Sequence, residues 1–367
     1  MQCTFCGLNG SSMLFRQKTP SRALEELRWL VERYGTYTQK VIASDNIMPF
    51  DFLRKFLPRL KELNLKLDLF YESKSNLHKK DIQLFRDVGL CTFQPGIESL
   101  STPVLRLMRK GVTGLQNIQL LKWCRQFGVK PSWNYLLGFP GERPEHYRGQ
   151  EQVILSIEHL CPPSYCGPIR FDRFSPYFTD PARFGISNLR PYPSYRFIYP
   201  NLNEHDLFDI AYFFVGEFEG QTEVDSYTRA VRNAVAEWQA SAPQFNLFAF
   251  NAGSLVLVWD TRGGRNDWCE LSKAEQFVLD ACDAIASRNH LLRRASASKG
   301  AIPNTERLDE VLAGLIEKRF LLCDEQMYLS VVIPFGEIAH PDAVVSQDAD
   351  GDLDANAALK PALADNA

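Results

Sequence analysis

The sequence predicts an α/β fold that begins as a partial TIM-type (β/α) barrel lacking its first strand and ends in an α+β carboxy-terminal region. Two observations predict this class. Short β-prone runs alternate with helical patterns up to about residue 175, and polar residues recur just beyond the predicted strands. Barrel enzymes place their active-site loops at the carboxyl ends of parallel strands, so the polar residues favour a barrel over an open sheet.

The alternation can be followed along the first 175 residues. Residues 21–34 carry apolar side chains at helical spacing after Pro20, which is a helix start signal. Further helical patterns cover residues 52–63, 81–88, 103–109, 116–127 and 144–160. The β-prone runs are residues 40–44, 65–71, 91–97, 131–137 and 168–174.

Polar pairs follow four of these runs, which places them at one edge of a parallel sheet. They are Asp45 with Asn46, Glu72 with Ser73, Glu98 with Ser99, and Gly141 with Glu142. A single polar pair at a strand end is ordinary loop composition, but four successive pairs indicate a site. We therefore expect residues 1–175 to form a domain with its site at this edge.

Three further regions follow. Residues 176–265 are rich in aromatic residues and proline, and we predict a substrate or capping region that contains helices at 203–217 and 226–239. A β-hairpin is predicted within it, from residues 247–250 and 254–259. Residues 266–337 predict a small winged-helix-like unit. Residues 338–367 are rich in Asp, Ala and Asn, with few large apolar groups, and predict a disordered tail.

Composition limits the class of protein. The chain has 367 residues, 45% of them hydrophobic, which is enough for a substantial core. A formal net charge of -3 gives no reason to expect nucleic acid as a partner. No apolar run approaches the roughly 20 residues that cross a bilayer, and no signal peptide is present, so we expect no membrane partner and a cytoplasmic location. Nine cysteines, an odd number, favour free thiols and metal ligation over disulfides.

A Cys-x-x-Cys pair opens the chain. Cys3 and Cys6 precede Gly7, and thiolates at this spacing can face one metal centre. Zinc and iron–sulfur sites commonly need three or four protein ligands, so the pair predicts at least one more. Cys161 and Cys166 form a second pair that could complete a structural zinc site. A zinc site would leave Asp45 and the glycine-rich stretch at residues 138–141 unexplained.

The amino-acid sequence of the opening loop is distinctive. Residues 3–10, Cys-Thr-Phe-Cys-Gly-Leu-Asn-Gly, resemble the cluster loop of radical S-adenosylmethionine (radical SAM) enzymes. More narrowly, they resemble the cobalamin-dependent subgroup that matures ribosomally synthesised peptides. Residues 44–47, 94–100 and 134–142 agree with this resemblance in order and spacing.

The resemblance implies roles for individual residues. Cys3 and Cys6 would each bind one iron of a 4Fe-4S cluster, and Phe5 would shield it. S-adenosylmethionine would chelate the iron that has no cysteine. The remaining cofactor contacts would be Asp45 and Asn46 at the methionyl amine, Glu98 and Ser99 near the ribose and methionyl groups, and Leu137, Gly138, Pro140 and Gly141 against the adenine.

The resemblance also implies an activity. Such enzymes generate a 5′-deoxyadenosyl radical with an electron from a donor, and this subgroup C-methylates a precursor peptide with methylcobalamin. In the family a third cluster cysteine precedes the pair, whereas only Met1 and Gln2 precede Cys3 here. We therefore expect a truncated copy that lacks this cysteine, the first strand and the cobalamin domain. The alternative is a catalytically inactive, peptide-binding remnant.

Overall fold

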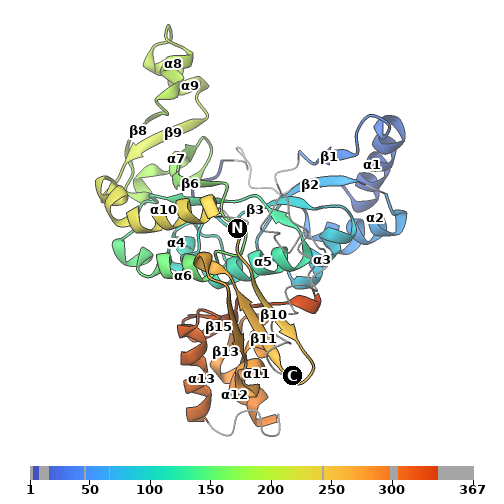
Figure 1. Cartoon of the computed structure of the whole chain (residues 1–367). Coiled ribbons are helices and arrows are strands. Elements are labelled where there is room, and N and C mark those ends of the chain that lie inside the picture. The colour runs from blue at the N-terminus through green and yellow to red at the C-terminus, as the bar shows by residue number, and fades with distance from the viewer. Residues whose placement is uncertain are drawn as a thin grey trace.

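The computed structural model describes residues 3–7, 16–44, 47–65, 67–241, 244–297 and 305–337. Its first part is a mixed α/β layer (Figure 1). The strands of this layer are β1 (Lys40–Ile42), β2 (Asp68–Ser73), β3 (Thr92–Pro95), β4 (Lys130–Pro131), β5 (Asn134–Leu137) and β6 (Tyr165–Pro168). The helices are α1 (Pro20–Tyr34), η1 (Phe52–Phe56), α2 (Leu57–Leu63), α3 (Lys79–Asp87), α4 (Thr102–Leu107), α5 (Gly114–Phe127), η2 (Pro144–Tyr147) and α6 (Gln150–Ser156).

All pairs in this layer are parallel. The order is β1-β2-β3-β4, and β5 pairs with β6. An isolated bridge between Glu98 and Tyr135 continues β3 alongside β5, so one parallel array runs from β1 to β6. Within the described residues β1 and β6 do not pair with each other, so the sheet is open and the predicted barrel is not confirmed.

Local sequence explains where several of these elements begin and end. Thr19 caps α1 by accepting a hydrogen bond from the Arg22 amide, and Pro20 occupies the first turn. Thr113 and Gln116 form a capping box at α5, which ends at Gly128 in the left-handed conformation. The predicted helix at 144–160 is broken into η2 and α6, because Gly149 adopts a positive φ of 74° between them.

The middle of the chain forms an arm (Figure 1). Its elements are β7 (Phe171–Asp172), α7 (Pro176–Thr179), η3 (Pro181–Phe184), β8 (Ser187–Pro191), α8 (Ser194–Ile198), α9 (Glu204–Ile210) and β9 (Phe213–Glu217). The three strands form an antiparallel sheet in the order β7-β9-β8. The helix predicted at 203–217 therefore ends at Ile210, because the alternating burial of residues 213–217 belongs to a strand. η4 (Gln221–Glu223) then leads into α10 (Val224–Ser241), which packs on α6.

The carboxy-terminal part contains two sheets. One has the order β12-β11-β10-β16 and contains the predicted hairpin; its strands are β10 (Leu247–Asn251), β11 (Val256–Asp260), β12 (Asp267–Glu270) and β16 (Ile333–Pro334). η5 (Arg262–Gly264) precedes β12, and η6 (Phe335–Glu337) follows β16. This sheet crosses the boundary predicted at residue 265.

The second sheet has the order β13-β15-β14. The chain order of this unit is α11 (Lys273–Ala281), β13 (Ala286–Ser287), α12 (Arg288–Ala297), α13 (Thr305–Glu317), β14 (Leu321–Asp324) and β15 (Met327–Ser330). This unit, predicted from the sequence to be winged-helix-like, therefore contains a helix, a strand, two helices and a β-hairpin. No helix in the described part of the chain has the length and apolar character needed to cross a bilayer.

Candidate functional site

The opening loop is held against the carboxyl edge of the parallel sheet. The fully buried Thr4 donates its amide to the Met108 carbonyl at 3.2 Å and accepts the Tyr177 amide at 3.0 Å. The Gly7 amide donates to the Asp172 carboxylate at 3.2 Å. A Cβ at Gly7 would lie 1.8 Å from the Arg173 carbonyl oxygen, so this position requires glycine. The loop is thereby fixed between α4 and the segment that follows β6.

The two cysteines of this loop are available as ligands. Cys3 and Cys6 are half-buried and form no disulfide. Burial raises the pKa of the nearby Tyr212 hydroxyl, and the charges of Asp172 and Cys6 add to that rise. Because the neighbouring Thr4, Phe5 and Gly7 are held at the strand-end edge, both thiols lie there, where the resemblance expects a cluster.

Phe5 joins the opening loop to the glycine-rich loop after β5. Its ring meets the Phe139 ring edge-on, with centroids 5.5 Å apart and an interplanar angle of 73°. Leu137, Gly138, Phe139 and Pro140 are all buried. Two stretches more than a hundred residues apart in sequence thus form one apolar wall beside the cysteines.

The glycine-rich loop is locked by a buried carboxylate. Glu142 Oε2 accepts the Gly138 amide at 2.9 Å and the Tyr227 hydroxyl at 3.1 Å, and Oε1 accepts the Tyr147 hydroxyl at 2.8 Å. Burial raises the pKa of Glu142, and these donors partly oppose the rise. Gly138 and Gly141 have φ values of 79° and 87°, which favour glycine. The loop is therefore rigidly tied to η2 and α10.

Glu98 brings a charge to the same edge. Its backbone has a φ of 60°, and its carboxylate lies 3.6 Å from Lys110 Nζ, both side chains being mostly buried. Burial raises the pKa of Glu98, and the Lys110 ammonium partly lowers it. Burial and the charge of Glu98 together raise the pKa of Glu72 at the end of β2. The edge therefore contains a coupled pair of carboxylates with one ammonium.

Three predicted cofactor contacts remain: Ser99, whose hydroxyl is engaged within the protein, and Asp45 and Asn46. Ser99 is fully buried and its hydroxyl accepts the Ser101 amide at 3.1 Å, so it is engaged in the turn after β3. Asp45 and Asn46 lie outside the described residues. The chain on either side of them is held by bonds from Ala43 to Phe70 and from Met48 to Glu72. The first flank therefore lies beside the middle of β2, and the second lies at its carboxyl end.

A four-cysteine zinc site is contradicted by the geometry. Cys161 Sγ donates to the Pro131 carbonyl at 3.4 Å, at the amino end of β5, whereas Cys3 and Cys6 lie at the carboxyl end. Across the residues that the structure describes, no three or more His, Cys, Asp or Glu side chains converge to hold a metal ion. The two thiols of the opening loop fit part of an iron–sulfur site, and a third ligand is not present in the described residues.

Some residues of this edge have no local sequence signal. Lys110 follows α4 and pairs with Glu98 only through the fold. Asp172 is likewise positioned by the return of the chain after β6, where burial raises its pKa and the Gly7 amide partly lowers it. Phe139 lies inside the glycine-rich stretch, and its apolar character between two glycines was the one signal that could have identified it.

Comparison with known proteins agrees with a functional site at this edge of the sheet. Residues 1–149 match the radical SAM superfamily. The radical SAM match includes the cysteine loop, Glu98 and the glycine-rich loop, and it covers less than half of the 367 residues. An uncharacterized methyltransferase of Pyrococcus horikoshii is 28% identical over 150 residues, which are 39% of this chain and 32% of that protein. The chain therefore spans about a third of the length of the curated relative that it matches.

Solved radical SAM structures are similar at low identity. The methyltransferase TsrM from Kitasatospora setae, with tryptophan substrate and a SAM analog bound, has 14% identity and a TM-score of 0.49 over 64% of this chain and 49% of its own. Coproporphyrinogen III oxidase (HemN) from Escherichia coli has 12% identity and a TM-score of 0.40 over 90% of this chain and 83% of its own. Both TM-scores are below 0.5, so neither structural likeness carries an argument about this chain, and the sequence match is confined to residues 1–149.

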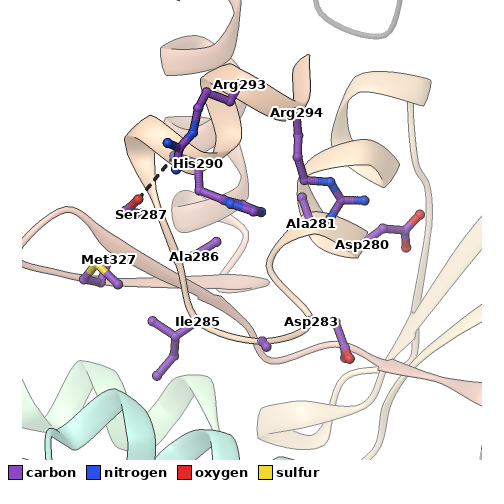
Figure 2. Close-up of a pocket in the computed structure, with 11 residues that line it drawn as sticks. Asp280, Ala281, Asp283, Ile285, Ala286, Ser287, His290, Arg293, Arg294 and Met327 are labelled. Carbon is purple, nitrogen blue, oxygen red and sulfur yellow. Dashed lines mark hydrogen bonds between the residues drawn. The ribbon is translucent and has the colours of Figure 1, made fainter. Parts of the chain in front are cut away.

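Two cavities lie away from the cysteine loop. One, of about 670 Å³, lies between η1 and α3. The other, of about 630 Å³, lies in the winged-helix-like unit (Figure 2), where His290, Arg293 and Arg294 project from α12 opposite Asp280. Both have cationic rims, and neither contains a cysteine.

Proposed function

We propose that this chain works as a radical SAM protein that modifies, and more narrowly C-methylates, a ribosomally synthesised precursor peptide. The observation that supports it best is the match of residues 1–149 to the superfamily, with Cys3 and Cys6 on a loop fixed at the sheet edge beside Glu98 and Phe139. The curated relative is named a methyltransferase, which supports the narrower statement.

The proposed cofactors are a 4Fe-4S cluster held in part by Cys3 and Cys6, and S-adenosylmethionine. When bound, they supply a 5′-deoxyadenosyl radical that abstracts hydrogen from a substrate carbon. An electron donor and a precursor peptide are the proposed partners. Cobalamin belongs to the proposal through the family resemblance, which associates it with a separate domain.

The chain's own residues would orient the bound cofactors and protect them from water. Glu98, whose pKa is raised by burial and partly lowered by Lys110, would in its ionised form accept hydrogen bonds from a cationic ammonium. Phe5 and Phe139 would exclude water beside the thiols, because their rings close one wall. Gly138 and Gly141 would let a flat ring approach the backbone, and Glu142 would hold that loop in place.

Iron content and cofactor cleavage test the proposal. The chain is reconstituted anaerobically with iron and sulfide, and iron and 5′-deoxyadenosine are measured. We expect about four irons per chain and release of 5′-deoxyadenosine. Cys3→Ala and Cys6→Ala should lose both, whereas Cys323→Ser, an exposed cysteine of the carboxy-terminal unit, should lose neither.

A second candidate is a peptide-binding protein without catalytic activity. The observation that favours it is the donor set, since only two thiols of the described residues face this edge. Substoichiometric iron that is insensitive to Cys3→Ala, with no 5′-deoxyadenosine, would support this candidate and overturn the first.

A further inference from the structure

We propose that the cavity between η1 and α3, called here the α3 groove, binds an acidic segment of the substrate peptide that also carries a large apolar side chain. The groove is lined by Phe50, Leu53, Arg54, His78, Lys80 and Leu84, among others. This inference rests on the proposed function and names the chemistry by which that site would recognise its substrate outside the reacting position.

The charges of the groove leave cations unpaired. Its two acidic side chains are already engaged: Asp81 accepts the His78 amide at 2.9 Å, and Asp87 pairs with Lys61 at 2.6 Å. Arg54 and Lys80 form no ion pair with any described residue. The net field of the groove therefore favours an anionic ligand.

An apolar surface lies beside these cations. Phe50 is 53% exposed, and the Lys74 ammonium lies 5.7 Å from its ring centroid. Leu53 and Leu84 are half-buried and line the same groove. An exposed aromatic ring and two leucines beside unpaired cations match a ligand that alternates carboxylates with an apolar group.

One end of the groove lies near the candidate site. The Met48 amide donates to the Glu72 carbonyl at 2.8 Å, so the segment that leads to Phe50 is tied to the end of β2. Glu72 pairs with Gln94 in the sheet, and the Gly96 amide donates to the Ser73 carbonyl at 3.1 Å, so the end of β2 lies beside the turn that contains Glu98. The Phe50 end of the α3 groove therefore lies near the same edge of the sheet as Glu98.

The shape favours a peptide. A volume of about 670 Å³ lies within the usual range for ligand sites, roughly 300 to 1,000 Å³. Arg54, His78 and Lys80 are exposed along an open rim, so the ligand is not enclosed and can continue beyond the groove. An extended chain with acidic side chains meets these conditions, because its charges are spaced along its length.

Calorimetric titration with a synthetic peptide tests this inference. The probe is a short unlabelled peptide with a leucine pair flanked by glutamates, added to the full chain without iron or S-adenosylmethionine. Arg54→Ala with Lys80→Ala should weaken binding about three- to tenfold, since each removes one ion pair of modest strength. Phe50→Ala should also weaken it, and added salt should weaken binding to the wild type more than to the double variant.

Matched controls remove side chains of the same kind from other parts of the protein. Arg293→Ala with Arg294→Ala removes two cations from the other cavity (Figure 2) and should leave the affinity unchanged. Phe197→Ala removes an aromatic ring that is 86% exposed on the arm and should also have no effect. The melting temperature of every variant checks that the fold is retained.

Three outcomes would overturn the inference. These are unchanged binding in Arg54→Ala with Lys80→Ala, loss of binding in the control pair only, and equal binding of a peptide with lysine in place of glutamate. Failure here is distinguishable from failure of the proposed function. A chain that releases 5′-deoxyadenosine but shows no acidic preference loses only this inference, and one that binds the peptide but holds no iron loses only the proposed chemistry.

Discussion

Glu98 is the residue at which burial, charge and backbone conformation meet most closely. A non-glycine residue at a φ of 60° is uncommon, and here it turns a carboxylate back toward Lys110 at the sheet edge. Burial disfavours the ionised carboxylate, and the ammonium opposes that effect. Burial therefore sets the upward direction of the Glu98 pKa shift, and a lysine outside the strand partly opposes it.

Lys110→Met should raise the pKa of Glu98 further, because the neutral side chain no longer stabilises the carboxylate. Ionisation of Glu98 would then occur at higher pH than in the wild type. The side-chain carboxyl carbon shift, followed by NMR across a pH series, measures this. Lys55→Met, which removes the exposed partner of Asp51, is the control and should leave Glu98 unaffected. An unchanged Glu98 titration in Lys110→Met would contradict the prediction.

At the scale of elements, the loop after β5 depends on one carboxylate and two tyrosines. Tyr227→Phe removes the hydroxyl that reaches Glu142 from α10. Hydrogen bonds to charged groups contribute about 1.5–3 kcal/mol, and Tyr227 is only half-buried, so we expect a loss near the lower figure. Urea unfolding measures it. Tyr37→Phe, whose side chain is 85% exposed, should cost almost nothing, and equal losses in both variants would reject this account.

Backbone conformation gives a second prediction for the same loop. Gly138→Ala should destabilise the protein by roughly 1–2 kcal/mol, because an L-residue at a φ of 79° is strained even though its Cβ would make only an ordinary contact, 3.5 Å from Val224. Gly314→Ala should instead stabilise by about 0.5–1 kcal/mol, since Gly314 lies inside α13 with no atom near its Cβ position. A Gly138→Ala variant at least as stable as the wild type would show that the loop does not require this conformation.

For the whole molecule, the winged-helix-like unit is joined to the parallel layer through polar contacts. Asp283 accepts Lys122 Nζ at 2.8 Å and Lys79 Nζ at 3.0 Å. The Lys122 side chain is fully buried, so burial lowers its pKa while Asp283 opposes the fall. Burial would raise the pKa of Asp283, but the two ammonium groups outweigh it and the net shift is downward.

Asp283→Asn should therefore cost several kcal/mol, about 3–5, because it leaves the Lys122 ammonium buried without a counter-charge. Lys79→Met should cost less than about 1 kcal/mol, since Lys79 is partly exposed. A lowered pKa contributes stability that is present above the unfolded value of about 3.9 and is lost as pH falls through the folded one. The free energy of unfolding, measured from pH 7 to pH 3, should fall in the wild type. It should fall less in Asp283→Asn. A cost for Asp283→Asn no greater than for Lys79→Met would contradict it.

Much of the local structure was predictable from sequence. The helical pattern after Pro20 becomes α1, the first four β-prone runs overlap β1 to β5, and the hairpin becomes β10 and β11. The run predicted at residues 168–174 meets β6 only at Pro168 and covers β7 instead. Helix caps and apolar periodicity act between residues a few positions apart, so a single sequence contains them. The pattern at residues 213–217 was misassigned, because a strand that pairs with β7 and β8 overrides a helical spacing.

The sequence by itself determined the alternating α/β layer, the Cys3–Cys6 loop with its superfamily match, and the glycines at residues 138 and 141. Only the tertiary structure decided that Phe5 meets Phe139, that Lys110 faces Glu98, and that Cys161 lies at the opposite end of the strands. It also decided that the described sheet is open. Such contacts join residues far apart in the chain and depend on strand order and twist, which local periodicity does not encode.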